Sequence, residues 1–144
     1  MQEALQEKNV IKKLQEMGYK PGIYVFVMKQ PSISLGSAAL FGVFAMAGNQ
    51  PKPFILSFAE TGISILELNA TFTKFKYTGL HAFIAVETVE EISFKKGWLI
   101  NTLSLRTKDG SKQIFKISKG NAVIPWQKAN VEKLERFIKT FEKN

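Results

Sequence analysis

The chain has 144 residues, is 45% hydrophobic and 22% charged, and contains no cysteine. This length fits one domain, and the composition excludes a disordered chain as the default. The lack of cysteine excludes disulfides, thiolate metal sites and cysteine nucleophiles, and it fits a reducing compartment. Because a charged, helix-favouring segment follows Met1, we expect no signal peptide. We therefore expect a cytoplasmic protein, with a peripheral position at the inner face of the membrane as an option.

The formal net charge is +8, and the whole excess lies in the last third of the chain. Residues 1–94 carry eight Lys or Arg against eight Glu, whereas residues 95–144 carry twelve Lys or Arg against four acids. Such an asymmetry indicates either a solvated basic face or an anionic partner.

Residues 2–17 predict an amphipathic helix, because apolar side chains such as Ile11 and Leu14 recur at a spacing of three to four. Gly18 is the expected end of this helix, since glycine adopts the left-handed cap conformation without a Cβ clash. The like-charge pair Glu3 and Glu7 does not support an isolated helix. We therefore expect this helix to depend on packing against the rest of the protein.

Short runs rich in β-branched and aromatic residues follow, and turn residues separate them. Turns are predicted at residues 60–62, at Asn69-Ala70 and at Thr78-Gly79. The first run is apolar on both faces, so we expect it at the centre of a sheet or beneath a helix. The predicted strands are residues 23–29, 54–58, 63–68 and 71–77, with residues 80–86 as a short strand or connection.

Residues 87–117 predict an antiparallel meander of three strands, in which Asp109-Gly110 is the last hairpin turn. Residues 126–142 then predict a second amphipathic helix. Its start is open between Pro125 as the first helical residue and Asn130 as the N-cap. The apolar stripe of this helix consists of Val131, Leu134, Phe137, Ile138 and Phe141.

The connection from Gln30 to Pro51 contains no charged residue, and its centre, residues 35–48, is apolar. The apolar run is shorter than the roughly 20 residues that span a bilayer, which argues against a membrane helix. Either it is a short buried helix or flap that covers one end of a barrel, or it is a surface for another chain. The candidate interface residues in the second interpretation are Leu35, Phe41, Val43, Phe44 and Met46.

The order of these elements resembles the bacterial pleckstrin-homology-like (PH-like) proteins. The matching stretches are FILSFAETGISILEL at residues 54–68, the meander at 87–117 and VEKLERFIKTF at 131–141. The resemblance implies an α+β fold in which about seven antiparallel strands form a bent, half-open barrel closed by the C-terminal helix. Residues 19–144 would form this PH-like domain, and residues 1–18 would be an additional N-terminal helix, within one globular unit.

The resemblance implies a fold more than a ligand. Phosphoinositide-binding members of the wider family carry a basic cluster around the first connection between strands. In this chain that connection is uncharged between Lys29 and Lys52.

The inventory of chemical groups argues against an enzyme. His81 is the only histidine and has no evident partner, and Asp109 is accounted for by its turn. Glu90 and Glu91 are neighbours on a predicted strand, so we expect them on opposite faces. No metal-ligand cluster and no glycine-rich phosphate motif occurs, so we expect neither a metal nor a cofactor.

We therefore predict a non-enzymatic binding module. Its expected partner is a protein or a second copy of the chain, bound through the insert at residues 35–48. The alternative is electrostatic binding to anionic membrane lipid or nucleic acid through the basic last third. The candidate residues for that alternative are Lys95, Lys96, Lys108, Lys112, Lys116 and Lys119.

Overall fold

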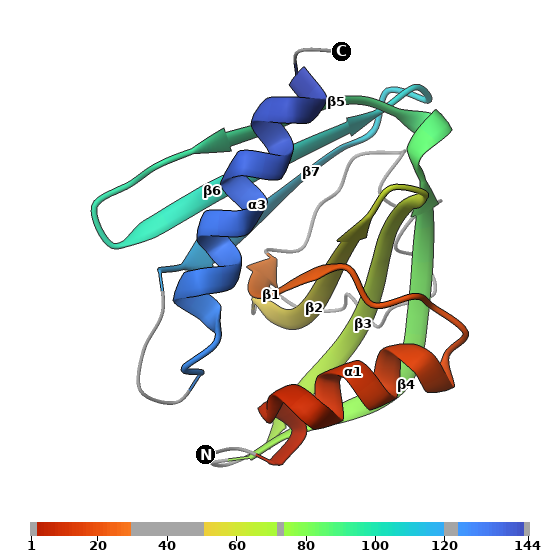
Figure 1. The fold of residues 1–144 in the computed structure, drawn as a ribbon, viewed down its shortest axis with the longest axis vertical. Helices are drawn as coiled ribbons and strands as arrows, with labels where there is room; N and C mark the ends of the chain where they lie inside the picture. The colour runs from red at the N-terminus through yellow and green to blue at the C-terminus, as the bar shows by residue number, and fades with distance from the viewer. Residues whose placement is uncertain (1–2, 30–50, 72–73, 120–123, 143–144) are drawn as a thin grey trace.

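The computed structural model describes residues 3–29, 51–71, 74–119 and 124–142 (Figure 1). Two helices and seven strands account for most of these residues, and two short 3-10 turns join them. In chain order the elements are η1 (Glu3–Leu5), α1 (Glu7–Glu16), β1 (Ile23–Lys29), β2 (Lys52–Ala59), β3 (Gly62–Thr71), β4 (Lys74–Ala85), η2 (Val86–Thr88), β5 (Val89–Lys95), β6 (Ile100–Thr107), β7 (Lys112–Ser118) and α3 (Gln127–Glu142).

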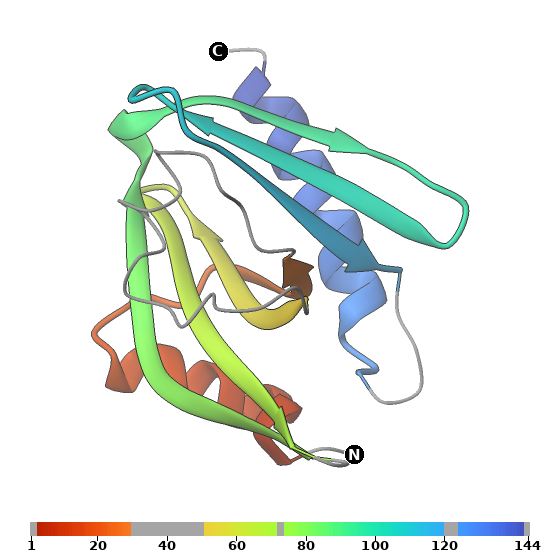
Figure 2. The ribbon, with the colours of Figure 1, turned by 180° about the vertical axis from the view of Figure 1, so that it is seen from behind.

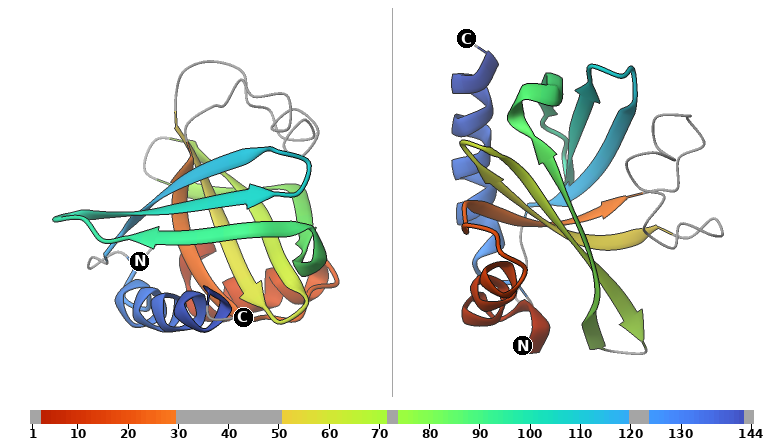
Figure 3. Two further views of the ribbon diagram at one scale, coloured as in Figure 1. Left: turned by 90° about the horizontal axis from the view of Figure 1, so that it is seen from above. Right: turned by 90° about the vertical axis from the view of Figure 1, so that its right-hand side faces the viewer.

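The seven strands form one antiparallel sheet in the order β4-β3-β2-β1-β7-β6-β5. The sheet bends sharply between β1 and β7, where only two residue pairs align, Met28 with Lys116 and Lys29 with Phe115. Two halves, β1–β4 and β5–β7, diverge from this short junction (Figures 2 and 3). The predicted α+β class and the predicted number of antiparallel strands are confirmed.

Helix α3 packs into the inner side of the bend, where it contacts β1 and β5 (Figure 1). Its predicted apolar stripe is confirmed: Val131, Leu134 and Ile138 are buried in the main core, and Phe137 and Phe141 pack against it. The sheet supplies alternate residues of each strand to this core, as the period of a strand requires. Among them are Val25, Val27, Phe54, Leu56, Ile65, Leu103, Leu105, Phe115 and Ile117.

Helix α1 covers the outer side of the β1–β4 half. Val10 and Leu14, together with Leu5 of η1, are fully buried in a second core against this half of the sheet. Strand β1 is therefore covered on both faces, as its apolar sequence predicts. Gly18 ends the helical segment with a φ of 84°, which confirms the predicted left-handed cap.

Two turns predicted in the β3–β4 region are wrong. Strand β3 continues through Asn69-Ala70 to Thr71, which pairs with Lys74. Strand β4 likewise continues through Thr78-Gly79 to Ala85, because a register shift between Leu66 and Leu68 of β3 absorbs the irregularity. Gly79 has a φ of 90°, so its turn-like conformation lies inside the strand.

Helix α3 starts at neither of the two residues that the sequence suggests. It begins at Gln127, and Asn130 lies inside the helix, where its Nδ2 donates to the backbone oxygen of Tyr24 at 2.9 Å. Gln127 is fully buried. Its side chain accepts from the amide of Phe26 at 2.9 Å and donates to the oxygens of Phe26 at 2.8 Å and Ser118 at 3.2 Å. The first turn of α3 thus satisfies backbone groups in the part of β1 that does not pair with β7.

Candidate functional site

The interface residues predicted in the insert lie outside the described residues. This applies to Leu35, Phe41, Val43, Phe44 and Met46 alike, so the self-association hypothesis remains a prediction. No helix within the described ranges has the length and apolarity needed to cross a membrane.

The groups that could act in catalysis are held in small local contacts. The hydroxyl of Tyr19 lies 2.6 Å from Nδ1 of His81, and the two rings meet edge to face. Asp109 Oδ1 accepts from the Thr107 hydroxyl at 2.6 Å and from the Ser111 amide at 2.9 Å, and these bonds lower the pKa of Asp109. The turn interpretation of Asp109 is therefore confirmed. Across the described ranges no three His, Asp or Glu side chains gather as metal ligands.

The prediction that Glu90 and Glu91 point to opposite faces is wrong, because both side chains contact the same arginine. A bulge shifts the register between Val89 and Glu91. Both carboxylates reach the guanidinium of Arg106, Glu91 at 3.0 Å and Glu90 at 3.8 Å. All three side chains are exposed, so the group stabilises the protein little, but the Arg106 charge is offset.

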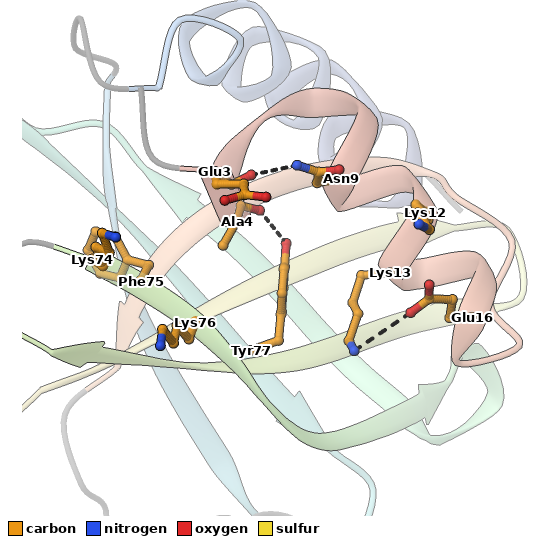
Figure 4. A pocket seen from close by; sticks show the side chains of 10 residues that line it. All are labelled: Glu3, Ala4, Asn9, Lys12, Lys13, Glu16, Lys74, Phe75, Lys76 and Tyr77. Carbon is orange, nitrogen blue, oxygen red and sulfur yellow. Dashed lines mark hydrogen bonds and ion pairs between the residues drawn. The ribbon is translucent and has the colours of Figure 1, made fainter.

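A groove of about 850 Å³ separates the N-terminal segment from the first half of β4 (Figure 4). Its lysines come from both walls, Lys12 and Lys13 from α1 and Lys74 and Lys76 from β4. The other lining residues are Glu3, Ala4, Asn9, Glu16, Phe75 and Tyr77.

The polar groups of this groove are largely engaged with one another. Lys13 lies 3.7 Å from Glu16 and 5.8 Å from the centre of the Tyr77 ring. The Tyr77 hydroxyl donates to the Ala4 oxygen at 2.8 Å, and burial raises its pKa. The N-terminal wall carries Glu3 and Glu16 beside Lys12 and Lys13, whereas the charged residues of the β4 wall are Lys74 and Lys76, so lysines outnumber acids four to two among the lining residues.

A charged cluster lies on the inner face of the sheet, at the ends of β1 and β2. Lys29 and Glu67 are buried, and Lys52 Nζ lies 3.7 Å from Glu67 Oε2. Burial lowers the pKa of Lys29 to about 8. Among the described residues Glu67 Oε2 has no hydrogen-bond donor, and the ion pair with Lys52 offsets the cost of its burial.

The structure brings together two of the six lysines predicted to bind anions. Lys95 of β5 and Lys116 of β7 both pair in register with Thr102 of β6, so the three side chains form one row across the sheet. Lys116 Nζ donates to the Thr102 hydroxyl at 3.1 Å. Within the described ranges, neither lysine forms an ion pair with a carboxylate.

This row lies on what we call the outer face of β5–β7, the face opposite to α3 (Figure 2). The alternating exposure of β6 and β7 separates it from the core. None of the described elements packs over it, and Ser93, Ser104 and Ile114 form the neighbouring row.

The other four lysines do not join this row, although Lys112 lies on the same face of the sheet. Lys96 turns to α3, where it lies 3.3 Å from Glu135. Lys112 pairs across the strands with Arg106, beyond the hydroxyl row. Lys108 is exposed in the β6–β7 turn, and Lys119 is exposed directly after β7. The six predicted residues therefore do not form a single cluster.

The tip of the β5–β6 hairpin is a feature that the sequence analysis missed. Trp98 is 88% exposed, Leu99 72% and Ile100 50%. Figure 3 shows this hairpin projecting beyond the rest of the molecule. The available signal was the run WLI directly after Lys95-Lys96-Gly97, because a hairpin turn does not require three large apolar residues in succession.

The backbone of this tip is fixed by a close contact and a hydrogen bond. The Gly97 amide donates to Oδ1 of the buried Asn101 at 3.2 Å. A Cβ atom on Gly97 would lie 2.1 Å from the oxygen of Ile100, so only glycine fits there. The chain thus holds Trp98 and Leu99 outward on a defined turn.

Comparison with known proteins gives no relative: no protein-family model, curated protein or solved structure matches the chain.

Proposed function

We propose that the chain is a non-enzymatic binding module of the PH-like type. The strand order, the bend between β1 and β7, and the helix α3 packed into that bend support this proposal. The departures from the type are α1 and the long insert between β1 and β2. Because folds host many functions, the ligand has to be argued from the surface.

The proposed ligand is an anionic membrane surface, bound by the outer face of β5–β7 at the inner face of the membrane. The observation that carries this is the row formed by Lys95, Thr102 and Lys116, in which two ammonium groups flank a hydroxyl and neither has a carboxylate partner among the described residues. Each lysine near an anionic bilayer contributes about 1 kcal/mol of attraction. Hydroxyls of the next row, on Ser93 and Ser104, could donate to headgroup oxygens.

Lipid headgroups fit this face better than nucleic acid does. Arginine is the residue that reads phosphate and guanine in pairs of hydrogen bonds, and Arg106, on this face, is engaged by Glu90 and Glu91. The described rows of the outer face also hold no aromatic side chain between the lysines, and Trp98 at the hairpin tip is a single exposed aromatic rather than a series on which successive bases stack.

Vesicle co-sedimentation tests the proposal, with phosphatidylcholine vesicles with and without phosphatidylserine. We expect binding only with phosphatidylserine and a steep loss with salt. The double variant Lys95→Glu, Lys116→Glu should bind at least roughly thirtyfold more weakly, because it loses two contributions of about 1 kcal/mol each. The matched control is Lys12→Glu, Lys76→Glu in the groove, which changes the net charge equally. Equal loss in both variants would mean that binding follows net charge, and a gel shift without vesicle binding would favour nucleic acid.

Self-association through the insert is a second candidate, favoured by its lack of charge and its large apolar side chains. Light scattering of the wild type beside a Phe41→Asp, Phe44→Asp variant tests it. A dimer that becomes a folded monomer would support the interface, and a monomeric wild type would count against it.

A further inference from the structure

We infer that the β5–β6 hairpin tip inserts Trp98 and Leu99 into the interface of the bilayer, which makes the partner of this face a lipid membrane. The inference rests on the proposed function and adds the mode of binding. Insertion would bury Trp98 and Leu99 in the bilayer interface and fix the orientation of the protein on the membrane.

The tip side chains are exposed to water without a structural reason. Among the described large apolar side chains, Trp98 and Leu99 are the two most exposed, and Ile100 follows them directly. Three such residues in succession form an apolar patch, which a monomeric protein keeps for a partner. Tryptophan is also the side chain that favours the membrane–water interface, because its ring is apolar and its N–H is polar.

The charges of the lysine row lie a short distance behind the apolar tip. Leu99 is three residues and Trp98 four residues from Thr102, so the row of Lys95 and Lys116 lies at most roughly 10–13 Å behind the tip. Interfacial apolar groups enter a membrane by about 5–10 Å. With Trp98 and Leu99 at that depth, both ammonium groups lie at the level of the lipid phosphates.

The tip is also preorganised and accessible. Gly97 and the buried Asn101 fix the turn, so binding would not have to order a mobile loop. The hairpin projects past the body of the molecule (Figure 3), so a flat surface can reach the tip. A pocket in a protein partner could take the same side chains, but the charges on both flanking strands match an extended anionic surface better.

Tryptophan fluorescence gives a direct test, because the chain has two tryptophans in opposite environments. Trp126 is buried and donates its Nε1 hydrogen to the Leu5 oxygen at 2.8 Å, whereas Trp98 faces water. We expect vesicles containing phosphatidylserine to shift the emission to the blue, and brominated lipids to quench it. In the Trp98→Phe variant both effects should vanish while the Trp126 emission remains.

Affinity provides the second readout. The Trp98→Ser, Leu99→Ser variant should bind vesicles roughly tenfold more weakly, because it loses the apolar anchors and keeps every lysine. Phe83→Ser, which changes a 43% exposed apolar residue on β4 outside this face, is the matched control and should bind within about twofold of the wild type. Equal melting temperatures of the variants would exclude a folding defect.

The outcomes separate the inference from the proposed function. Salt-dependent vesicle binding without a blue shift or quenching would overturn insertion and leave the electrostatic proposal standing. No vesicle binding at all would overturn both. A blue shift that grows with protein concentration in the absence of lipid would overturn the inference in favour of a second copy of the chain.

Discussion

Replacement of Gln127 by alanine tests the structural role of the first turn of α3. The Gln127 amide satisfies the backbone N–H and C=O of Phe26, in the part of β1 where β7 has diverged from it. Alanine has no group that could take over these bonds, and the site is closed to water because Gln127 is fully buried. Two buried backbone groups of β1 would then lose their partners.

The expected cost follows from the price of an unsatisfied buried polar group, about 1–3 kcal/mol. Two such groups at Phe26 give a loss of roughly 2–6 kcal/mol in the free energy of unfolding. The third bond, to the Ser118 oxygen, is only partly buried and adds little. Asn130→Ala removes one bond, to the Tyr24 oxygen, so it should cost about 1–3 kcal/mol.

Urea unfolding followed by circular dichroism measures these differences at an unchanged m-value. Lys128→Ala, at the exposed neighbouring position, is the control and should change the free energy of unfolding by less than about 0.5 kcal/mol. Gln127→Ala with a loss below about 1 kcal/mol would contradict the assignment of these bonds as the closure of β1.

Three further predictions concern stability. Lys29 has a pKa of about 8, below the ordinary 10.5 of the unfolded chain, so the folded state binds fewer protons between these values. The wild type should therefore gain up to about 1.4 kcal/mol per pH unit above pH 8, and Lys29→Met should lose this dependence in pH-resolved urea titrations. Leu14→Ala should lower the free energy of unfolding by about 2–5 kcal/mol in the same assay, because this α1 side chain is fully buried against the sheet. A loss below about 0.5 kcal/mol, as at a surface position, would place α1 outside the cooperative unit. Gly22→Ala should lower the melting temperature, since its Cβ would lie 2.1 Å from the Phe58 oxygen; no change would contradict that close approach.

Local patterns predicted the elements whose signals agree with their tertiary surroundings. Asp109-Gly110 closes the β6–β7 hairpin, and the alternation of residues 101–107 matches their alternating burial. The turn predictions in the β3–β4 region were wrong because pairing across two long strands overrides the turn propensities of Asn69 and Gly79. The predicted start of α3 was wrong for a related reason. Gln127 is fixed by hydrogen bonds to Phe26 of the distant strand β1 and not by a local cap.

The candidate site was predictable in its charge but not in its geometry. The excess of lysine in the last third is visible in the sequence, but the pairing of Lys95 and Lys116 with Thr102 depends on the registers of two hairpins. The tip was missed because apolar runs are usually buried, and nothing local shows that Trp98 faces water. The contact of Glu90 and Glu91 with one arginine required a bulge, which the sequence does not signal.

The distribution of charge along the chain follows from which faces of the sheet are covered. Helix α1 covers the outer side of β1–β4, which is apolar, and α3 covers the inner side of the bend. The outer face of β5–β7 is therefore a part of the sheet that none of the described elements covers (Figure 2). Residues on that face must tolerate water, and lysines and hydroxyls do so. Trp98 and Leu99 do not follow this rule, although their backbone is held in place by Gly97 and Asn101. A surface that only had to stay soluble would not present them, so the basic face and its apolar tip are best explained together, as one contact.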